Sequence, residues 1–331
     1  MTMTPGAVAA APSAITVASQ LFVEQHMARA VALGEHLADL VEAPNAFMAD
    51  INKGLAQLSD ANAVDGIRVI APGIGPVLGV RLPLLEATHK RLRKGMKGAP
   101  TAAVLEIADR LLREEAAEIR WFGMMTLERL LSSDSDRTWQ LMRRAAREAT
   151  DWVSVDTLAH SFATGLLLEP RRWSDLQMLV HSSSRWERRL VGATVATLPH
   201  IKRVGAKDTG VAGRGLMLIG QLMGDAEPDV QKALSWALRS MAAIDLPATA
   251  AFLRAEARTA RDTADGHRAW VVRDACERLP GALATELKAT LGGVRKRPGA
   301  PSTSRASATA ADFLTYGLAV PPAERTVIDR S

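Results

Sequence analysis

The segment Asp229-Val230-Gln231-Lys232-Ala233-Leu234-Ser235-Trp236-Ala237-Leu238-Arg239 decides the fold. Its apolar residues follow helical spacing, and Pro228 precedes it, where proline suits the first turn of a helix. A basic residue with an apolar residue six positions later recurs at intervals of about 40 residues: Arg189 with Val195, Lys232 with Leu238, and Arg273 with Leu279. Helix pairs that repeat at about 40 residues are typical of HEAT and armadillo arrays. The sequence therefore predicts an all-α fold, a HEAT-like helical-repeat solenoid.

The rest of the chain has the same helical periodicity from residue 15 onward and no alternating pattern typical of strands. After Leu291 the composition changes to Gly, Pro, Ser and basic residues, which favours a flexible segment. We therefore expect three parts: a flexible N-terminus (1–14), a HEAT-like helical-repeat domain (15–291) and a basic, largely disordered C-terminal tail (292–331).

Composition bounds the class of protein. The 331 residues are 47% hydrophobic, enough for a sizeable core, and the net charge of +5 permits an anionic partner without establishing one. The single cysteine, Cys276, excludes an intramolecular disulfide and favours a reducing compartment, and its amphipathic context predicts a buried thiol. No apolar run of about 18 residues and no secretory signal is found, so we expect a cytoplasmic protein without membrane spans.

Two segments of the N-terminal half invite a phosphate-binding interpretation. Residues 67–76 contain glycines and prolines, but they lack the Gly-Lys-Ser/Thr and Gly-x-Gly-x-x-Gly patterns, so we interpret them as a connecting loop. Residues 82–95 predict a helix with proline in its first turn and glycine at its end. The basic cluster that closes this helix either interacts favourably with the helix dipole or contacts phosphate.

The segment 150–160 places an aromatic ring, a carboxylate and an imidazole on one helical face, because Trp152, Asp156 and His160 are spaced four residues apart. Each has a structural alternative: Asp156 can charge a helix start, Trp152 can belong to the core, and His160 can be a hydrogen-bonded structural histidine. A metal site built on Asp156 and His160 has no convincing third ligand.

Three runs, in this order and spacing, resemble the AlkD family of DNA alkylation repair proteins, bacterial HEAT-like DNA glycosylases. Trp152-Val153-Ser154-Val155-Asp156 is similar to the family's tryptophan followed four residues later by aspartate. Ser182 to Arg189 resembles its Ser-x-x-x-Trp-x-x-Arg run, and Gln231 to Arg239 resembles its Gln-Lys-Ala-x-x-Trp-x-x-Arg run. The similarity extends from about residue 80 to residue 279.

The resemblance implies roles for individual residues. Asp156 would be the catalytic carboxylate, with Trp152 and Trp236 as the aromatic walls that face the damaged nucleotide. Arg189 and Arg239 would contact phosphates, with Arg188 and Lys232 of the same runs as further DNA contacts. The implied partner is duplex DNA with alkylated bases, bound by a monomer associated with the nucleoid and using no metal or other cofactor.

The implied chemistry is hydrolysis of an N-glycosidic bond. Alkylation at N3 of adenine or N7 of guanine makes the base cationic and hence a good leaving group, so the developing oxocarbenium sugar chiefly needs a nearby anion. The chain departs from the family in lacking a tyrosine near the start of the DNA face, since its one tyrosine is Tyr316. A non-catalytic HEAT-repeat DNA-binding or scaffold protein, and a protein-binding adaptor, remain the alternatives.

Overall fold

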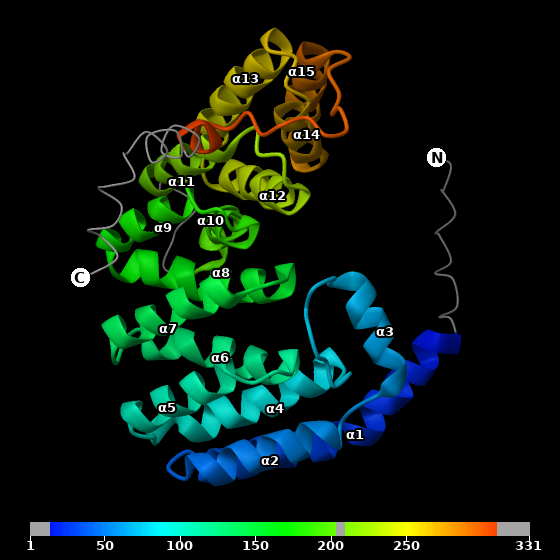
Figure 1. Ribbon diagram of the computed structural model, residues 1–331, viewed down its shortest axis with the longest axis vertical. Helices are drawn as coiled ribbons and strands as arrows, with labels where there is room; N and C mark the ends of the chain where they lie inside the picture. The colour runs from blue at the N-terminus through cyan, green and yellow to red at the C-terminus, as the bar shows by residue number, and fades with distance from the viewer. Residues whose placement is uncertain (1–13, 203–208, 310–331) are drawn as a thin grey trace, which may run out of the picture. The chain divides into compact units, whose positions relative to one another are not determined.

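The computed structural model describes residues 14–202 and 209–309. Throughout these residues the named elements are helices, and an isolated bridge between Ser59 and Val80 is the sole pairing of extended segments among them, which confirms the all-α class. No helix in this part of the chain is both long and apolar enough to cross a membrane. The helices are α1 (Ala14–Asp39), α2 (Pro44–Ala56), α3 (Ala61–Ile70), α4 (Leu82–Gly95), α5 (Thr101–Leu112), α6 (Ala117–Leu130), α7 (Ser135–Glu148), α8 (Trp152–Leu168), α9 (Trp173–Leu179), α10 (Arg185–Thr197), α11 (Thr209–Leu222), α12 (Pro228–Ile244), α13 (Leu246–Asp262), α14 (Gly266–Ala275) and α15 (Gly281–Leu291), with short 3-10 helices at Met96–Gly98, Pro170–Arg172, Leu198–His200 and Cys276–Arg278 (Figure 1).

The chain divides into two compact units, Met1–Thr126 and Leu127–Ser331, with the division inside α6. In the first unit α1 packs on α4 and α2 packs on α5. The absence of a side chain at Gly34 permits the close approach of α1 and α4, because a Cβ there would lie 2.2 Å from the carbonyl oxygen of Thr88. The observed bounds of α4 confirm the predicted helix with a proline start and a glycine end.

The loop between α3 and α4 is organised by a buried carboxylate of α6. Glu118 accepts backbone hydrogen bonds from Leu78 (3.0 Å), Gly79 (2.8 Å) and Val80 (3.2 Å). Gly79 has a φ of +84°, and a Cβ there would lie 2.6 Å from the carbonyl oxygen of Asp60, so this turn requires glycine. Because the protein's own carboxylate takes these N–H groups, they are not free to bind phosphate. Residues 71–76 lie in this connecting loop, as predicted, whereas residues 67–70 of the predicted loop form the last turn of α3.

The second unit contains a succession of helix pairs. The second helices of the pairs, α8, α10, α12 and α14, contact one another in that order, and each also packs on the helix before it: α7, α9, α11 and α13. Gly192 allows α10 and α12 to approach closely, since a Cβ there would lie 2.9 Å from the Cβ of Ala233. Stacked helix pairs of this kind bury a continuous core between neighbours. They are the helical repeat that the 40-residue pattern predicted.

The structure describes the first part of the predicted C-terminal tail, which begins at residue 292. Residues 292–309 pack on the second unit, where the backbone N–H of Thr303 donates to the carbonyl oxygen of Gly224 at 2.9 Å and Ser304 is 1% exposed. Composition does not reveal this docking, because hydrogen bonds to residues far away in sequence and the burial of the small Ala306 hold the segment. Residues 310–331 and most of the predicted flexible N-terminus lie outside the described residues.

Candidate active site

A buried aspartate fixes where α8 begins and thereby places the candidate catalytic residues. The carboxylate of Asp151 accepts hydrogen bonds from the backbone N–H (2.9 Å) and the hydroxyl (2.7 Å) of Ser154, which is an N-cap interaction. Trp152 is therefore the first residue of the helix, and Asp156 follows one turn later on the same face. Asp151 therefore has a structural role as the N-cap of α8. Asp156 takes no part in this cap, so its carboxylate is free to make other contacts.

Asp156 forms a bidentate ion pair with Arg189 of α10. The guanidinium Nε lies 3.1 Å and its Nη2 lies 2.7 Å from the two carboxylate oxygens. The third nitrogen, Nη1, donates to the backbone carbonyl of Asp229 in α12 at 2.7 Å. The side chain of Arg189 is only 7% exposed, whereas that of Asp156 is 21% exposed. The pair thus joins α8, α10 and α12, the second helices of three neighbouring pairs, while part of the carboxylate remains accessible.

Burial raises the pKa of Asp156 above its ordinary value, and the negative charges of Asp151 and Asp229 contribute in the same direction. The hydrogen bonds and positive charge of Arg189 oppose this rise. Charge interactions are stronger in such a partly dry setting than in water. Asp156 can therefore supply a negative charge close to a ligand, while Arg189 limits the cost of keeping it ionised.

Two half-buried indoles lie on the helices that carry this site. The Arg189 guanidinium is 5.9 Å from the ring centroid of Trp152, so Trp152, Asp156 and Arg189 form one group. Trp236 lies on α12, which packs directly on α10. The contacts found among the described residues do not join Trp236 to that group. The structure thus brings two of the three predicted catalytic residues together and places the third on the next helix of the stack.

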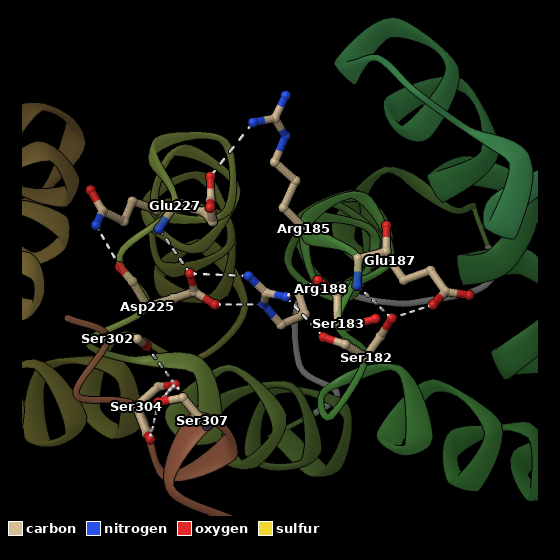
Figure 2. Close-up of polar contacts among 12 residues, drawn as sticks. Ser182, Ser183, Arg185, Glu187, Arg188, Asp225, Glu227, Ser302, Ser304 and Ser307 are labelled. Atoms are coloured by element: carbon tan, nitrogen blue, oxygen red, sulfur yellow. Dashed lines mark hydrogen bonds and ion pairs between the residues drawn. The ribbon is translucent and has the colours of Figure 1, made fainter. Parts of the chain in front are cut away.

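The four predicted DNA-binding cations have different surroundings. Arg188 donates to Asp225 at 2.7 Å and to the backbone carbonyls of Ser182 and Ser183 at 2.8 Å and 3.0 Å, so it stabilises the start of α10 (Figure 2). Arg189 has all three nitrogens engaged within the protein, as described above. These two arginines therefore have structural partners that account for their positions, and their contact with phosphate stays a prediction.

The other two cations lie on α12. Arg239 forms an ion pair with Asp274 of α14 at 2.8 Å and remains partly accessible. Lys232 is exposed, and no ion pair of its ammonium group is found within the described residues. Lys232 and Arg239 flank Trp236 in sequence at spacings of four and three residues, which places all three on one face of α12.

His160 does not contact the candidate carboxylate. Its Nδ1 lies 2.9 Å from a carboxylate oxygen of Glu128, which also accepts a hydrogen bond from Thr164 at 3.2 Å. The hydrogen bond to Glu128 raises the pKa of His160. Of the two alternatives for this histidine, the hydrogen-bonded structural residue is therefore the one observed, and its partner is Glu128 rather than Asp156.

Sequence reasoning missed two features of this surface. The first is the bidentate contact of Arg189 with Asp156, which the predicted phosphate contact of Arg189 did not anticipate. The second is Trp270, which is half-buried and carries the Lys296 ammonium 4.1 Å from its ring centroid, although sequence reasoning gave it no role at this surface. The signal for Trp270 was present, because the spacing Trp-x-x-Arg occurs at 186–189, 236–239 and again at 270–273. The predicted burial of Cys276 is confirmed, and Tyr316 lies outside the described residues.

The fold and this site define a class: an all-α protein built of stacked helix pairs, with a partly accessible carboxylate beside indole and guanidinium groups. A family model described as DNA alkylation repair enzyme matches residues 51–279, more than half of the chain. The chain belongs to this family of DNA alkylation repair enzymes. No curated protein sequence matches it significantly. The match includes the candidate site and ends before residues 292–309.

Proposed function

We propose that this protein is a DNA glycosylase that hydrolyses the N-glycosidic bond of cationic alkylated purines, of the 3-methyladenine and 7-methylguanine type, in duplex DNA. The observation that carries the proposal is the Asp156 carboxylate beside the Trp152 indole. It is partly buried, which strengthens its interaction with a nearby positive charge, and it is still 21% exposed, so a ligand can reach it. Membership of a DNA alkylation repair family supports the choice of substrate. We further propose, as the family resemblance implies, that the protein acts as a monomer in the cytoplasm and associates with the nucleoid.

In the proposed reaction the bond between C1′ and the purine nitrogen breaks first. The electron pair leaves with the base, which departs neutral because its alkyl group had made it cationic. The sugar becomes an oxocarbenium ion, and Asp156 stabilises this positive charge electrostatically. A water molecule then attacks C1′ and gives up a proton to Asp156 or to solvent, which leaves an abasic site. The proposal needs no metal and no other cofactor.

Arg189 acts in this scheme as a positioning residue. Its bidentate contact fixes the orientation of the carboxylate, and its charge opposes the effect of burial on the Asp156 pKa. Trp152 and Trp236 present aromatic faces, whose quadrupole attracts cationic character by about 0.5 to 2 kcal/mol. We assign them to the walls around the damaged nucleotide.

The test is the release of 7-methylguanine from methylated duplex DNA by the wild-type protein and by Asp156→Asn. Removing one charge-stabilising group from an active site costs about 100-fold to 1,000-fold in rate, so we expect a loss of that size. Asp175→Asn is the matched control, since Asp175 is another half-buried carboxylate near an indole (2.7 Å from Trp139 Nε1) and should retain full activity.

The alternative function is a non-catalytic DNA-binding scaffold, in which the Asp156–Arg189 pair merely holds α8, α10 and α12 together. That reading predicts DNA binding by both proteins and release of 7-methylguanine by neither. An adaptor that binds only proteins predicts that DNA binding, with its dependence on salt, is absent altogether. Either outcome, DNA binding without base release or no DNA binding at all, would contradict the glycosylase proposal.

A further inference from the structure

Residues 292–304, here called the strap, follow α15 and return across the second unit toward the end of α11 (Figure 1). The hydroxyls of Ser302 and Thr303 both donate to the carbonyl oxygen of Gly224, each at 3.3 Å. The Ser304 hydroxyl lies within hydrogen-bond distance of those of Ser302 and Ser307, at 3.2 Å and 3.1 Å (Figure 2). These bonds anchor residues 302–304, the far end of the strap, beside the end of α11.

The near end of the strap brings basic residues onto α14. Arg273 of α14 donates to the carbonyl oxygens of Gly292 (2.9 Å) and Val294 (2.6 Å). Arg295 donates to the same two carbonyls, at 3.2 Å and 3.1 Å. Backbone oxygens orient these two guanidinium groups without neutralising them. Lys296 is held in the same manner by the face of Trp270 rather than by a carboxylate.

These groups join the cations of α12 to form a cluster with unbalanced charge. Burial lowers the pKa of Lys296, the negative charge of Asp274 opposes this, and the positive charge of Lys232 lowers it further. Burial and the charge of Arg295 lower the pKa of Arg273, and both guanidinium groups bind the same two carbonyl oxygens, so this pair of like charges lies close together. Asp274 is the acid found within this group, and it is already paired with Arg239. The strap cluster consists of five cations and one carboxylate: Lys232, Arg239, Arg273, Arg295, Lys296 and Asp274.

A solvated basic face is the ordinary explanation for surface cations, and helix ends attract them. Two observations argue for a ligand instead. Hydrogen bonds and a cation–π contact hold these like charges close together. Their mutual repulsion is unfavourable unless a ligand supplies negative charge. The cluster also continues the face of α12 that carries Trp236, so it adjoins the residue that the resemblance assigns to the wall of the site.

We propose that the strap cluster binds the phosphate backbone of duplex DNA and extends the DNA-binding surface of the proposed glycosylase beyond its family-matched helices. The occupant is the phosphodiester backbone, because a row of fixed cations with one acid is complementary to repeated single negative charges. The Lys296 ammonium lies over the face of Trp270, 4.1 Å from the ring centroid, and a phosphate oxygen would contact the N–H groups that do not face the ring. This inference rests on the proposed function, although its test requires only DNA binding.

The experiment measures the affinity of the full-length protein for an undamaged fluorescent duplex between 50 and 300 mM salt. The variant is Arg295→Gln with Lys296→Met, since methionine removes the charge and leaves a flexible apolar side chain that can pack against Trp270. Each lost phosphate contact reduces the slope of log K against log salt by about 0.9. We expect the slope to fall by about 1.8 and the affinity at 0.1 M salt to weaken roughly tenfold for each contact.

The matched control is Arg254→Gln with Arg261→Gln, which removes two exposed arginines of α13 that are paired with Glu286 and Asp262. Its slope should equal that of the wild type. If the strap variant loses its fold by circular dichroism, the single variant Lys296→Glu replaces it, with Lys296→Arg expected to retain the wild-type slope. A folded strap variant with an unchanged slope overturns the proposal.

Failure of this inference is distinguishable from failure of the proposed function. If Asp156→Asn abolishes base release while the strap variant keeps the wild-type slope, the strap proposal fails and the glycosylase proposal stands. If the wild type releases no base while the strap variant has a reduced slope of log K against log salt, the glycosylase proposal fails and the strap proposal stands. The Asp156→Asn protein itself should keep or exceed the wild-type affinity, because it loses a negative charge.

Discussion

Two tryptophans of the second unit lie beside an arginine and an aspartate, and the comparison separates a structural group from a candidate site. Trp139 of α7 is 6% exposed, with the guanidinium of Arg172 4.5 Å from its ring centroid and its Nε1 donating to Asp175 at 2.7 Å. Trp152 of α8 is half-buried, and its neighbouring arginine makes a bidentate pair with Asp156. The same residue types are therefore arranged differently.

The difference lies in how the polar atoms are used. Around Trp139 the carboxylate of Asp175 is 34% exposed and is used within the group, since it accepts the indole N–H and pairs with Arg143. Around Trp152 the carboxylate of Asp156 is less exposed, at 21%, and it binds the buried Arg189 rather than an indole N–H, while burial raises its pKa. A carboxylate whose pKa is shifted by burial beside a specific charged partner is a candidate for action on a ligand.

The largest expected effect that tests this comparison concerns stability. Trp139→Ala should lower the free energy of unfolding by about 3 to 5 kcal/mol, as large-to-small substitutions of buried aromatic residues do. Trp152→Ala should cost less than half of that, because its ring is only half-buried. Urea denaturation followed by far-ultraviolet circular dichroism measures both. Equal losses for the two variants would mean that Trp152 belongs to the core.

The second effect concerns the arginine of the candidate site. Arg189→Lys keeps the charge but loses the bidentate contact, and misplacement of a catalytic group by about 1 Å can cost up to 100-fold, so we expect kcat/KM for base release to fall roughly tenfold to 100-fold. Because the Arg189 hydrogen bonds lower the pKa of Asp156, their loss should raise that pKa further.

The raised pKa of Asp156 in Arg189→Lys should also change how kcat/KM depends on pH. Only the ionised carboxylate stabilises the oxocarbenium sugar, so activity falls as the pH falls through the pKa of Asp156. The acid limb of the kcat/KM profile should therefore move to higher pH in Arg189→Lys. Arg188→Lys is the matched control, because the adjacent arginine pairs with Asp225 instead and should leave the limb in place. A limb unmoved by Arg189→Lys would remove Arg189 from the mechanism.

The comparison also shows how far sequence reasoning reaches. Helical period, the 40-residue recurrence and proline and glycine positions predicted the all-α repeat and the bounds of α4, because these signals are local. The spacing of Trp152 and Asp156 likewise predicted their shared face. The pairing of Asp156 with Arg189 depends on how α8 and α10 pack, and periodicity within one helix carries no information on that contact.

The docked strap could not be predicted for a related reason. Its glycines, prolines and serines are typical of flexible segments, and its stability comes from partners that lie far away in sequence, such as Gly224 and Asp265. Lys296 beside Trp270 is a consequence of that docking. Recurrence of the spacing Trp-x-x-Arg was the available signal for Trp270, and it became meaningful only when α12 and α14 were seen to pack together.

The smallest expected effect sharpens the structural half of the comparison. Asp175→Ala leaves the Nε1 of Trp139 without its acceptor, and a lost hydrogen bond of this kind costs about 1 kcal/mol, or more if the donor stays buried and unsatisfied. Asp175→Asn should recover most of this stability, since the amide oxygen can still accept from the indole N–H. Urea midpoints distinguish the two variants, and base release should remain at the wild-type level in both. A large loss of base release in the folded Asp175→Asn protein would instead show that the Trp139 group takes part in catalysis, and the distinction between a structural group and a candidate site would then fail.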